Sequence, residues 1–135
     1  MTGNRILIIE DNLLNLELAA DLLEANGFLV SSAQTAEEGL RMARELLPDL
    51  VLMDFGLPGM DGLGATQVLK ADPATRYLTI VGLSAHAMKG DEEIALKAGC
   101  AGYLTKPIHT RTFPETIQRF IASASERPTT KSPPE

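Results

Sequence analysis

Five short apolar runs, three of which are followed directly by a residue with a carboxylate or a hydroxyl side chain, limit most strongly what this chain can fold into. The runs span residues 6–9, 28–32, 50–53, 78–83 and 102–105. The first, third and fourth are rich in isoleucine, leucine and valine and lack a regular alternation of polar and apolar residues. Such runs are typical of strands buried on both faces of a parallel sheet. We therefore predict five strands.

Helical patterns lie between and after these predicted strands. They span residues 13–25, 36–47, 63–71, 88–98 and 113–124. Thr35, with Glu38 three residues later, is typical of a capping box at the start of the second helix. Pro48 and Gly99 follow two of the patterns and indicate helix ends. The repeated strand and helix predict an α/β fold, a doubly wound five-stranded parallel sheet with helices on both faces.

Length and charge narrow the classes of protein that fit this sequence. With 135 residues, we expect one domain over residues 1–125 and a disordered tail over 126–135, where three prolines occur without apolar periodicity. A net charge of −6 without a Lys/Arg-rich run argues against direct nucleic-acid binding. No apolar run approaches the roughly 18 residues of a membrane helix. Cys100 has no second cysteine, so we expect a cytoplasmic protein without membrane insertion.

Polar residues with functional chemistry follow the predicted strands. Glu10 and Asp11 follow the first strand, Asp54 the third, Ser84 the fourth, and Lys106 the fifth. The carboxyl ends of parallel strands meet at one edge of a sheet, where α/β proteins bind ligands. Neighbouring carboxylates repel one another, and Mg²⁺, which prefers oxygen ligands, relieves that repulsion. We therefore predict a Mg²⁺ site there, completed by a backbone carbonyl just after Asp54.

Asp54 is the predicted nucleophile at this edge. Carboxylates form covalent aspartyl phosphates in several protein classes. Phosphoryl transfer depends mainly on positioning and on stabilising the charge of the phosphoryl oxygens. Lys106 and Ser84 supply an ammonium group and a hydroxyl group for those oxygens.

Four spaced motifs resemble the receiver domain of two-component response regulators, a flavodoxin-like fold. They are Ile-Ile-Glu-Asp-Asn at 8–12, Leu-Met-Asp-Phe-Gly-Leu-Pro-Gly-Met-Asp-Gly at 52–62, Leu-Ser-Ala-His-Ala-Met at 83–88 and Tyr-Leu-Thr-Lys-Pro at 103–107. The stretch 87–100 particularly resembles single-domain regulators of the bacterial cell-division and polarity type. The resemblance implies a stand-alone receiver, a monomer or weak dimer, in a phosphorelay.

The resemblance also implies roles for individual residues. Asp54 is the phosphoacceptor, and Mg²⁺ is held by Glu10, Asp11, Asp54 and the backbone carbonyl of Gly56. Lys106 binds the phosphate, as does Ser84. The donor is a phosphohistidine on a histidine kinase or a histidine phosphotransfer protein, and the phosphorylated form binds a downstream protein effector.

Two further pairs of residues concern switching and phosphate lifetime. The family's switch hydroxyl corresponds to Ser84 and its switch aromatic to Tyr103, although the Tyr103 ring could instead simply pack at the sheet edge. Gly56 and His86 occupy the positions that tune phosphate hydrolysis in the family. An exposed loop imidazole without such a role is the alternative for His86.

The first predicted helix carries two apolar stripes, one more than packing against a sheet requires. The second stripe includes Leu14 and Leu18, and either a partner or a neighbouring helix covers it. In the family the first helix and the loop after the fifth strand contact the phosphodonor protein. That resemblance places Leu14, Leu18, Pro107 and Ile108 at the docking surface.

Two other functions compete with this prediction. An aspartate-nucleophile phosphatase of the haloacid dehalogenase kind also uses Mg²⁺ on a parallel sheet, but it needs a second aspartate where this chain has Gly56. A pseudo-receiver would bind partners without phosphorylation, against which the complete set of strand-end residues argues. We expect no enzyme activity beyond self-phosphorylation on Asp54 and autodephosphorylation.

Overall fold

A computed structural model describes residues 3–57, 62–84, 91–106 and 108–125. The expected tail at 126–135, His86 and Pro107 lie outside the described residues. In chain order the elements are β1 (Arg5–Ile9), α1 (Leu13–Ala25), β2 (Leu29–Ala33), α2 (Ala36–Leu46), β3 (Leu50–Asp54), α3 (Gly62–Ala71), β4 (Thr79–Ser84), α4 (Asp91–Ala98), β5 (Gly102–Thr105) and α5 (Phe113–Ser125).

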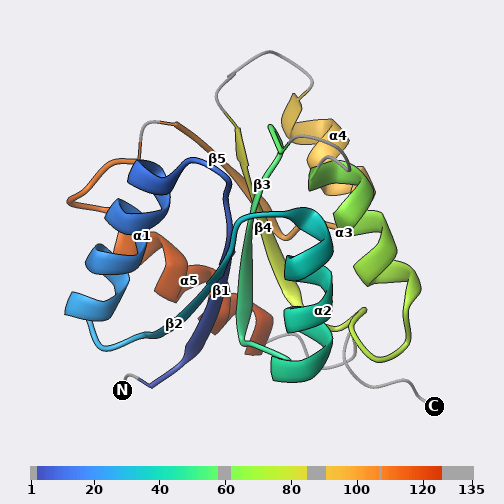
Figure 1. Ribbon diagram of the computed structural model, residues 1–135, viewed down its shortest axis with the longest axis horizontal. Helices are drawn as coiled ribbons and strands as arrows, with labels where there is room; N and C mark the ends of the chain where they lie inside the picture. The colour runs from blue at the N-terminus through green and yellow to red at the C-terminus, as the bar shows by residue number, and fades with distance from the viewer. Residues whose placement is uncertain (1–2, 58–61, 85–90, 107, 126–135) are drawn as a thin grey trace.

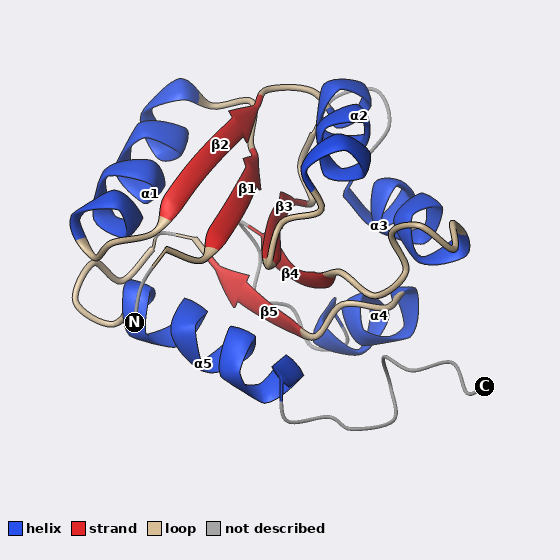
Figure 2. Ribbon diagram, turned by 90° about the horizontal axis from the view of Figure 1, so that it is seen from below, coloured by secondary structure: helices blue, strands red, loops and turns tan. Residues whose placement is uncertain are grey.

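The five strands form one parallel sheet in the order β2-β1-β3-β4-β5. Helices α1 and α5 cover one face, and α2, α3 and α4 cover the other (Figures 1 and 2). The predicted doubly wound α/β fold is therefore confirmed. Strand β3, which ends at Asp54, lies at the centre of the sheet.

Alternate residues of the central strands enter two separate hydrophobic cores. The first core, beneath α2, α3 and α4, includes Leu7, Ile9, Val51, Met53 and Ile80. The second core, beneath α1 and α5, includes Ile6, Ile8, Leu50, Leu52, Val81 and Leu83. All of these side chains are buried, as expected for strands that are covered on both faces. This double burial holds the strand ends, and the polar residues that follow them, in fixed positions.

Side-chain caps begin the first two helices. The Asn12 Oδ1 accepts the N–H of Asn15 at 3.0 Å, and the Thr35 Oγ1 accepts the N–H of Glu38 at 3.1 Å. The Glu38 carboxylate accepts the N–H of Gln34 at 3.4 Å, one residue before the cap. Each cap satisfies a backbone donor that has no partner within its helix.

Several element boundaries differ by one residue from the sequence prediction, and two of these differences have a visible structural cause. Helix α2 ends at Leu46 because Leu47 adopts the left-handed conformation, with φ 46° and ψ 61°. Strand β2 begins at Leu29, because the Phe28 N–H bonds to the carbonyl of Leu23 and its ring is buried in the second core. Among the described residues, the helices are all too short or too polar to cross a membrane.

Candidate functional site

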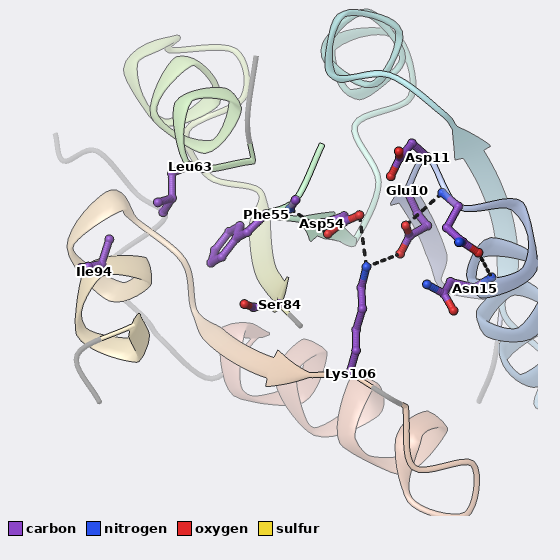
Figure 3. A pocket seen from close by; sticks show the side chains of 11 residues that line it. Glu10, Asp11, Asn15, Asp54, Phe55, Leu63, Ser84, Ile94 and Lys106 are labelled. Carbon is purple, nitrogen blue, oxygen red and sulfur yellow. Dashed lines mark hydrogen bonds and ion pairs between the residues drawn. The ribbon is translucent and has the colours of Figure 1, made fainter. Parts of the chain in front are cut away.

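The residues that follow the strands converge on one pocket with a volume of about 460 Å³. Its lining consists of Glu10, Asp11, Asn12, Asn15, Asp54, Phe55, Gly56, Leu63, Ser84, Ile94 and Lys106. Figure 3 shows the Lys106 side chain reaching toward Asp54 and Glu10 from the end of β5. The structure thus brings together all five predicted strand-end residues.

Lys106 contacts both buried carboxylates of the pocket. Its Nζ lies 3.3 Å from Oε1 of Glu10 and 3.3 Å from Oδ2 of Asp54. Its backbone N–H donates to the carbonyl of Ser84 at 2.7 Å, which ties the chain after β5 to the end of β4. Burial opposes the ammonium charge, but Asp54 and Glu10 outweigh this effect and raise the pKa of Lys106. Lys106 therefore carries a fixed positive charge beside Asp54.

The Glu10 side chain is 1% exposed, and its contacts offset only part of the cost of burying a carboxylate. Its Oε2 accepts the N–H of Asn12 at 3.1 Å, whereas its buried Oε1 has no hydrogen-bond partner among the described residues. Burial, a hydrogen bond with Asp54 and the charge of Asp54 raise the pKa of Glu10 to about 7, against the opposing effects of Asn12 and Lys106. A buried oxygen without a hydrogen bond is costly, and the Lys106 ammonium 3.3 Å away offsets only part of that cost.

Asp54 is 2% exposed and is held at one oxygen. Its Oδ1 accepts the backbone N–H of Gly56 at 2.9 Å, while its Oδ2 lies beside Lys106. The backbone at Asp54 lies close to the start of α3. A Cβ at Gly62 would collide with the carbonyl oxygen of Asp54, so only glycine permits this approach. These contacts position the carboxylate that ends the central strand.

The acidic side of the pocket fits a divalent cation. Glu10, Asp11 and Asp54 each place one carboxylate oxygen so that the three atoms lie within 4.8 Å of one another. Asp11 is exposed, whereas Glu10 and Asp54 are buried, so the cluster opens to solvent on one side. Mg²⁺ binds such oxygen ligands while keeping several waters, and a bound ion or one of its waters would supply the partner that Oε1 of Glu10 lacks. The Gly56 carbonyl as a further ligand stays a prediction.

The predicted switch residues occupy neighbouring strands. Ser84 is buried in the pocket at the end of β4. Tyr103 on β5 is half-buried, and its ring centroid lies 6.0 Å from that of Phe55 at a tilt of 33°. Of the two predicted lifetime-tuning positions, Gly56 lines the pocket, and His86 falls outside the described residues.

The predicted docking residues differ in accessibility. Leu14 is 77% exposed and Leu18 is 41% exposed, so the second stripe of α1 stays largely uncovered by the described chain. Ile108 is partly buried against the second core, which leaves less of its side chain for a partner. Pro107 is outside the described residues.

Several pocket residues escaped the sequence prediction. Asn12 carries a recognisable signal, since an asparagine directly before a helical pattern is a common N-cap. Asn15 belongs to the first turn of the same helix. Phe55, Leu63 and Ile94 are apolar residues of the lining, and nothing in their local sequence distinguishes them from ordinary core positions.

Comparison with known proteins gives consistent matches. A family model for the response regulator receiver domain matches residues 6–118. The polar-differentiation response regulator DivK of Brucella ovis is 43% identical over 119 residues, which are 88% of this chain and 97% of that protein.

Solved structures with the same fold include proteins with related sequences. A receiver domain of a sensor histidine kinase from Pseudomonas aeruginosa PAO1 is 34% identical, covers 90% of this chain and 99% of its own, and has a TM-score of 0.81. That structure has a magnesium ion coordinated in the active site cleft. A CheY-like receiver domain protein from Methanospirillum hungatei is 28% identical, covers 92% of this chain and 98% of its own, and has a TM-score of 0.82.

Proposed function

The chain belongs to the response regulator receiver domain family, and from that premise we propose that it accepts a phosphoryl group on Asp54 and thereby switches its contacts with other proteins. The observation that supports this proposal most directly is the buried Asp54 carboxylate with the Lys106 ammonium 3.3 Å away. Asp54 ends the central strand of the sheet and opens into the pocket, where a donor phosphate has access to it.

The proposed reaction exchanges one bond to phosphorus for another. A carboxylate oxygen of Asp54 attacks the phosphorus of a phosphohistidine, a new P–O bond forms, and the P–N bond breaks with its electron pair on the imidazole nitrogen. The nitrogen then takes up a proton from solvent. Lys106 offsets the negative charge of the phosphoryl oxygens, and the Ser84 hydroxyl donates a hydrogen bond to one of them.

The acidic residues of the pocket would hold Mg²⁺ through Glu10, Asp11, Asp54 and the backbone carbonyl of Gly56. When bound, the ion neutralises the carboxylates and the incoming phosphate. The chain itself orients the nucleophile, since the Gly56 N–H fixes Oδ1 of Asp54 and Lys106 faces Oδ2. The buried position of Glu10 and Asp54 keeps bulk water from one side of the reacting atoms.

Phosphorylation would act as a switch because it replaces the single negative charge of the Asp54 carboxylate with a larger group that carries about −1.5 to −2 charges. Ser84 would turn toward the phosphate, and Tyr103 would move with it, changing the surface of α4, β5 and α5. The proposed partners are a histidine kinase or histidine phosphotransfer protein as donor and a downstream protein effector in a phosphorelay, in the cytoplasm. Donor docking would use the exposed Leu14 and Leu18 on α1, with Pro107 and Ile108 after β5.

Mass spectrometry after incubation with Mg²⁺ and a small phosphodonor, acetyl phosphate, tests the proposal. We expect a gain of one phosphate that Asp54→Asn abolishes. A protein that gains none behaves as a pseudo-receiver. Turnover of a small phosphate monoester would instead identify a phosphatase, and we expect none because Gly56 supplies no acid two residues after Asp54.

A further inference from the structure

The Phe55 ring takes the place of a side chain on the neighbouring strand. Phe55 directly follows Asp54, and its backbone N–H donates to the carbonyl of Leu83 on β4 at 2.9 Å. A Cβ at Gly82 would collide with the Cζ of the ring and lie 2.7 Å from Cε2 and 2.8 Å from Cε1. The ring therefore rests directly on the β4 backbone, and only glycine at position 82 leaves space for it.

The same ring reaches Tyr103 on the next strand. Gly82 pairs with Tyr103 in the β4–β5 ladder, and the Phe55 and Tyr103 centroids are 6.0 Å apart. Both aromatic residues pack against the first core. Phe55 thus connects the end of β3 to β5 across the glycine of β4.

Phe55 also forms part of the pocket wall. It lines the pocket with Leu63 of α3 and Ile94 of α4. Figure 3 shows these three side chains on the side away from Glu10 and Asp11, and it draws Ser84 below the Phe55 ring in this view. The ring consequently borders the site of the new charge on one side and Tyr103 on the other.

We propose that Phe55 is a positioning residue that holds Tyr103 in its resting place and must leave Gly82 when Asp54 is phosphorylated. This inference rests on the proposed function. Gly82 and Ser84 are two residues apart on β4 and so face the same side of the sheet. Tyr103 pairs with Gly82, so a movement of Tyr103 toward Ser84 crosses the space that the Phe55 ring fills. Close-packed interiors have no room for two aromatic rings there.

The Tyr103 ring can be observed separately from the rest of the chain. The protein contains two tyrosines and no tryptophan, so Tyr77→Phe leaves Tyr103 as the only tyrosine signal. In this background we would record the Tyr103 ring resonances by NMR before and after acetyl phosphate and Mg²⁺, with the phosphate gain measured on the same samples. The variants are Phe55→Ala, Phe55→Leu, Gly82→Ala and the double variant Phe55→Ala/Gly82→Ala.

We expect Phe55→Ala to move the unphosphorylated Tyr103 resonances most of the way to their phosphorylated positions, and Phe55→Leu to move them less. Gly82→Ala should shift them strongly in the presence of the ring and weakly in its absence, because the added methyl group acts through Phe55. A general loss of packing would change the thermal midpoint without this dependence on Phe55. The two Phe55 variants and Gly82→Ala change the same contact from opposite sides, so a folding failure of one leaves the others informative.

Unchanged Tyr103 resonances in Phe55→Ala and Phe55→Leu, with normal phosphate gain, would overturn the inference and leave the proposed function intact. Additive effects of Phe55→Ala and Gly82→Ala would overturn it as well. A parent that gains no phosphate refutes the proposed function and the phosphate-dependent half of the inference. In that case the unphosphorylated samples still test whether Phe55 holds Tyr103 in place, through the dependence of the Gly82→Ala shift on the Phe55 ring.

Discussion

The ammonium nitrogen of Lys106 lies 3.3 Å from Oδ2 of Asp54, although β5 and β3 are separated by β4 in the sheet. The lysine spans β4 because its own backbone N–H is anchored to the last residue of that strand, Ser84. The same ammonium group also faces Glu10 of β1. One cation therefore connects the ends of three strands at the carboxylate where phosphorylation is proposed.

Lys106→Gln removes that cation, and we expect phosphorylation of Asp54 by acetyl phosphate to slow by about 10- to 100-fold. The loss corresponds to one charge-assisted contact of roughly 1.5–3 kcal/mol. Initial rates of phosphate gain by mass spectrometry measure it. Lys97→Gln, an exposed lysine in the last turn of α4, is the matched control, and equal rates for both variants would contradict the role of Lys106.

Glu10 should make the stability of the metal-free protein depend on pH. Its pKa rises from 4.5 when unfolded to about 7 when folded, so folding favours the protonated carboxyl group. The stability that this pKa shift contributes is fully present below about pH 4.5 and is lost as the pH rises through 7. The loss in the free energy of unfolding has an upper limit of about 3 kcal/mol.

Urea unfolding in EDTA between pH 5 and 8 measures this effect. In the parent, the free energy of unfolding should decline as the pH rises, and we expect Glu10→Gln to flatten this decline. Mg²⁺ should restore stability to the parent at pH 8, where the deprotonated carboxylate is free to bind it. A parent and a Glu10→Gln variant with parallel pH profiles would show that Glu10 titrates at its ordinary value.

Leu47→Gly should stabilise the protein by about 1 kcal/mol, because Leu47 has a positive φ of 46° that glycine adopts without a Cβ clash. The side chain is 53% exposed, so little buried contact is lost. Thermal or urea unfolding checks the gain. Leu47→Ala is the control that removes the side chain but keeps the Cβ, and a similar gain from alanine would show that backbone strain is not the cause.

Leu14→Glu and Leu18→Glu should slow phosphotransfer from a phosphohistidine protein by about 10-fold or more, because each places a charge on an apolar docking surface. Phosphorylation by acetyl phosphate, which needs no docking, should keep its rate. Leu96→Glu, an equally apolar and 47% exposed position on α4, serves as the control. The docking hypothesis fails when the α1 variants and the parent accept phosphate from the protein donor at the same rate.

The convergence of Glu10, Asp54, Ser84 and Lys106 was predictable because each follows an apolar strand. Parallel pairing puts all carboxyl ends at one edge, so the order of residues along the chain is enough to place them together. The boundaries of most helices followed in the same way from capping residues and helix breakers. These features depend on local sequence or on the strict periodicity of a buried strand.

Other features depend on contacts between distant residues that no local pattern encodes. The position of the Phe55 ring requires an absent Cβ at Gly82, on a different strand. Leu13 shares a helical stripe with the buried Leu16, yet it is 54% exposed. The raised pKa of Glu10 likewise arises from burial that the assembled pocket alone produces.

Every neighbouring pair of strands in this sheet is parallel, so no tight hairpin can start its assembly. Each pairing must wait until a crossover with at least one helix has closed, which makes folding slower than in a helical protein of similar length. Lys106 follows the strand that joins the sheet at its edge. A growing chain that has not yet reached β5 therefore contains Glu10 and Asp54 without the lysine that faces both carboxylates in the finished fold.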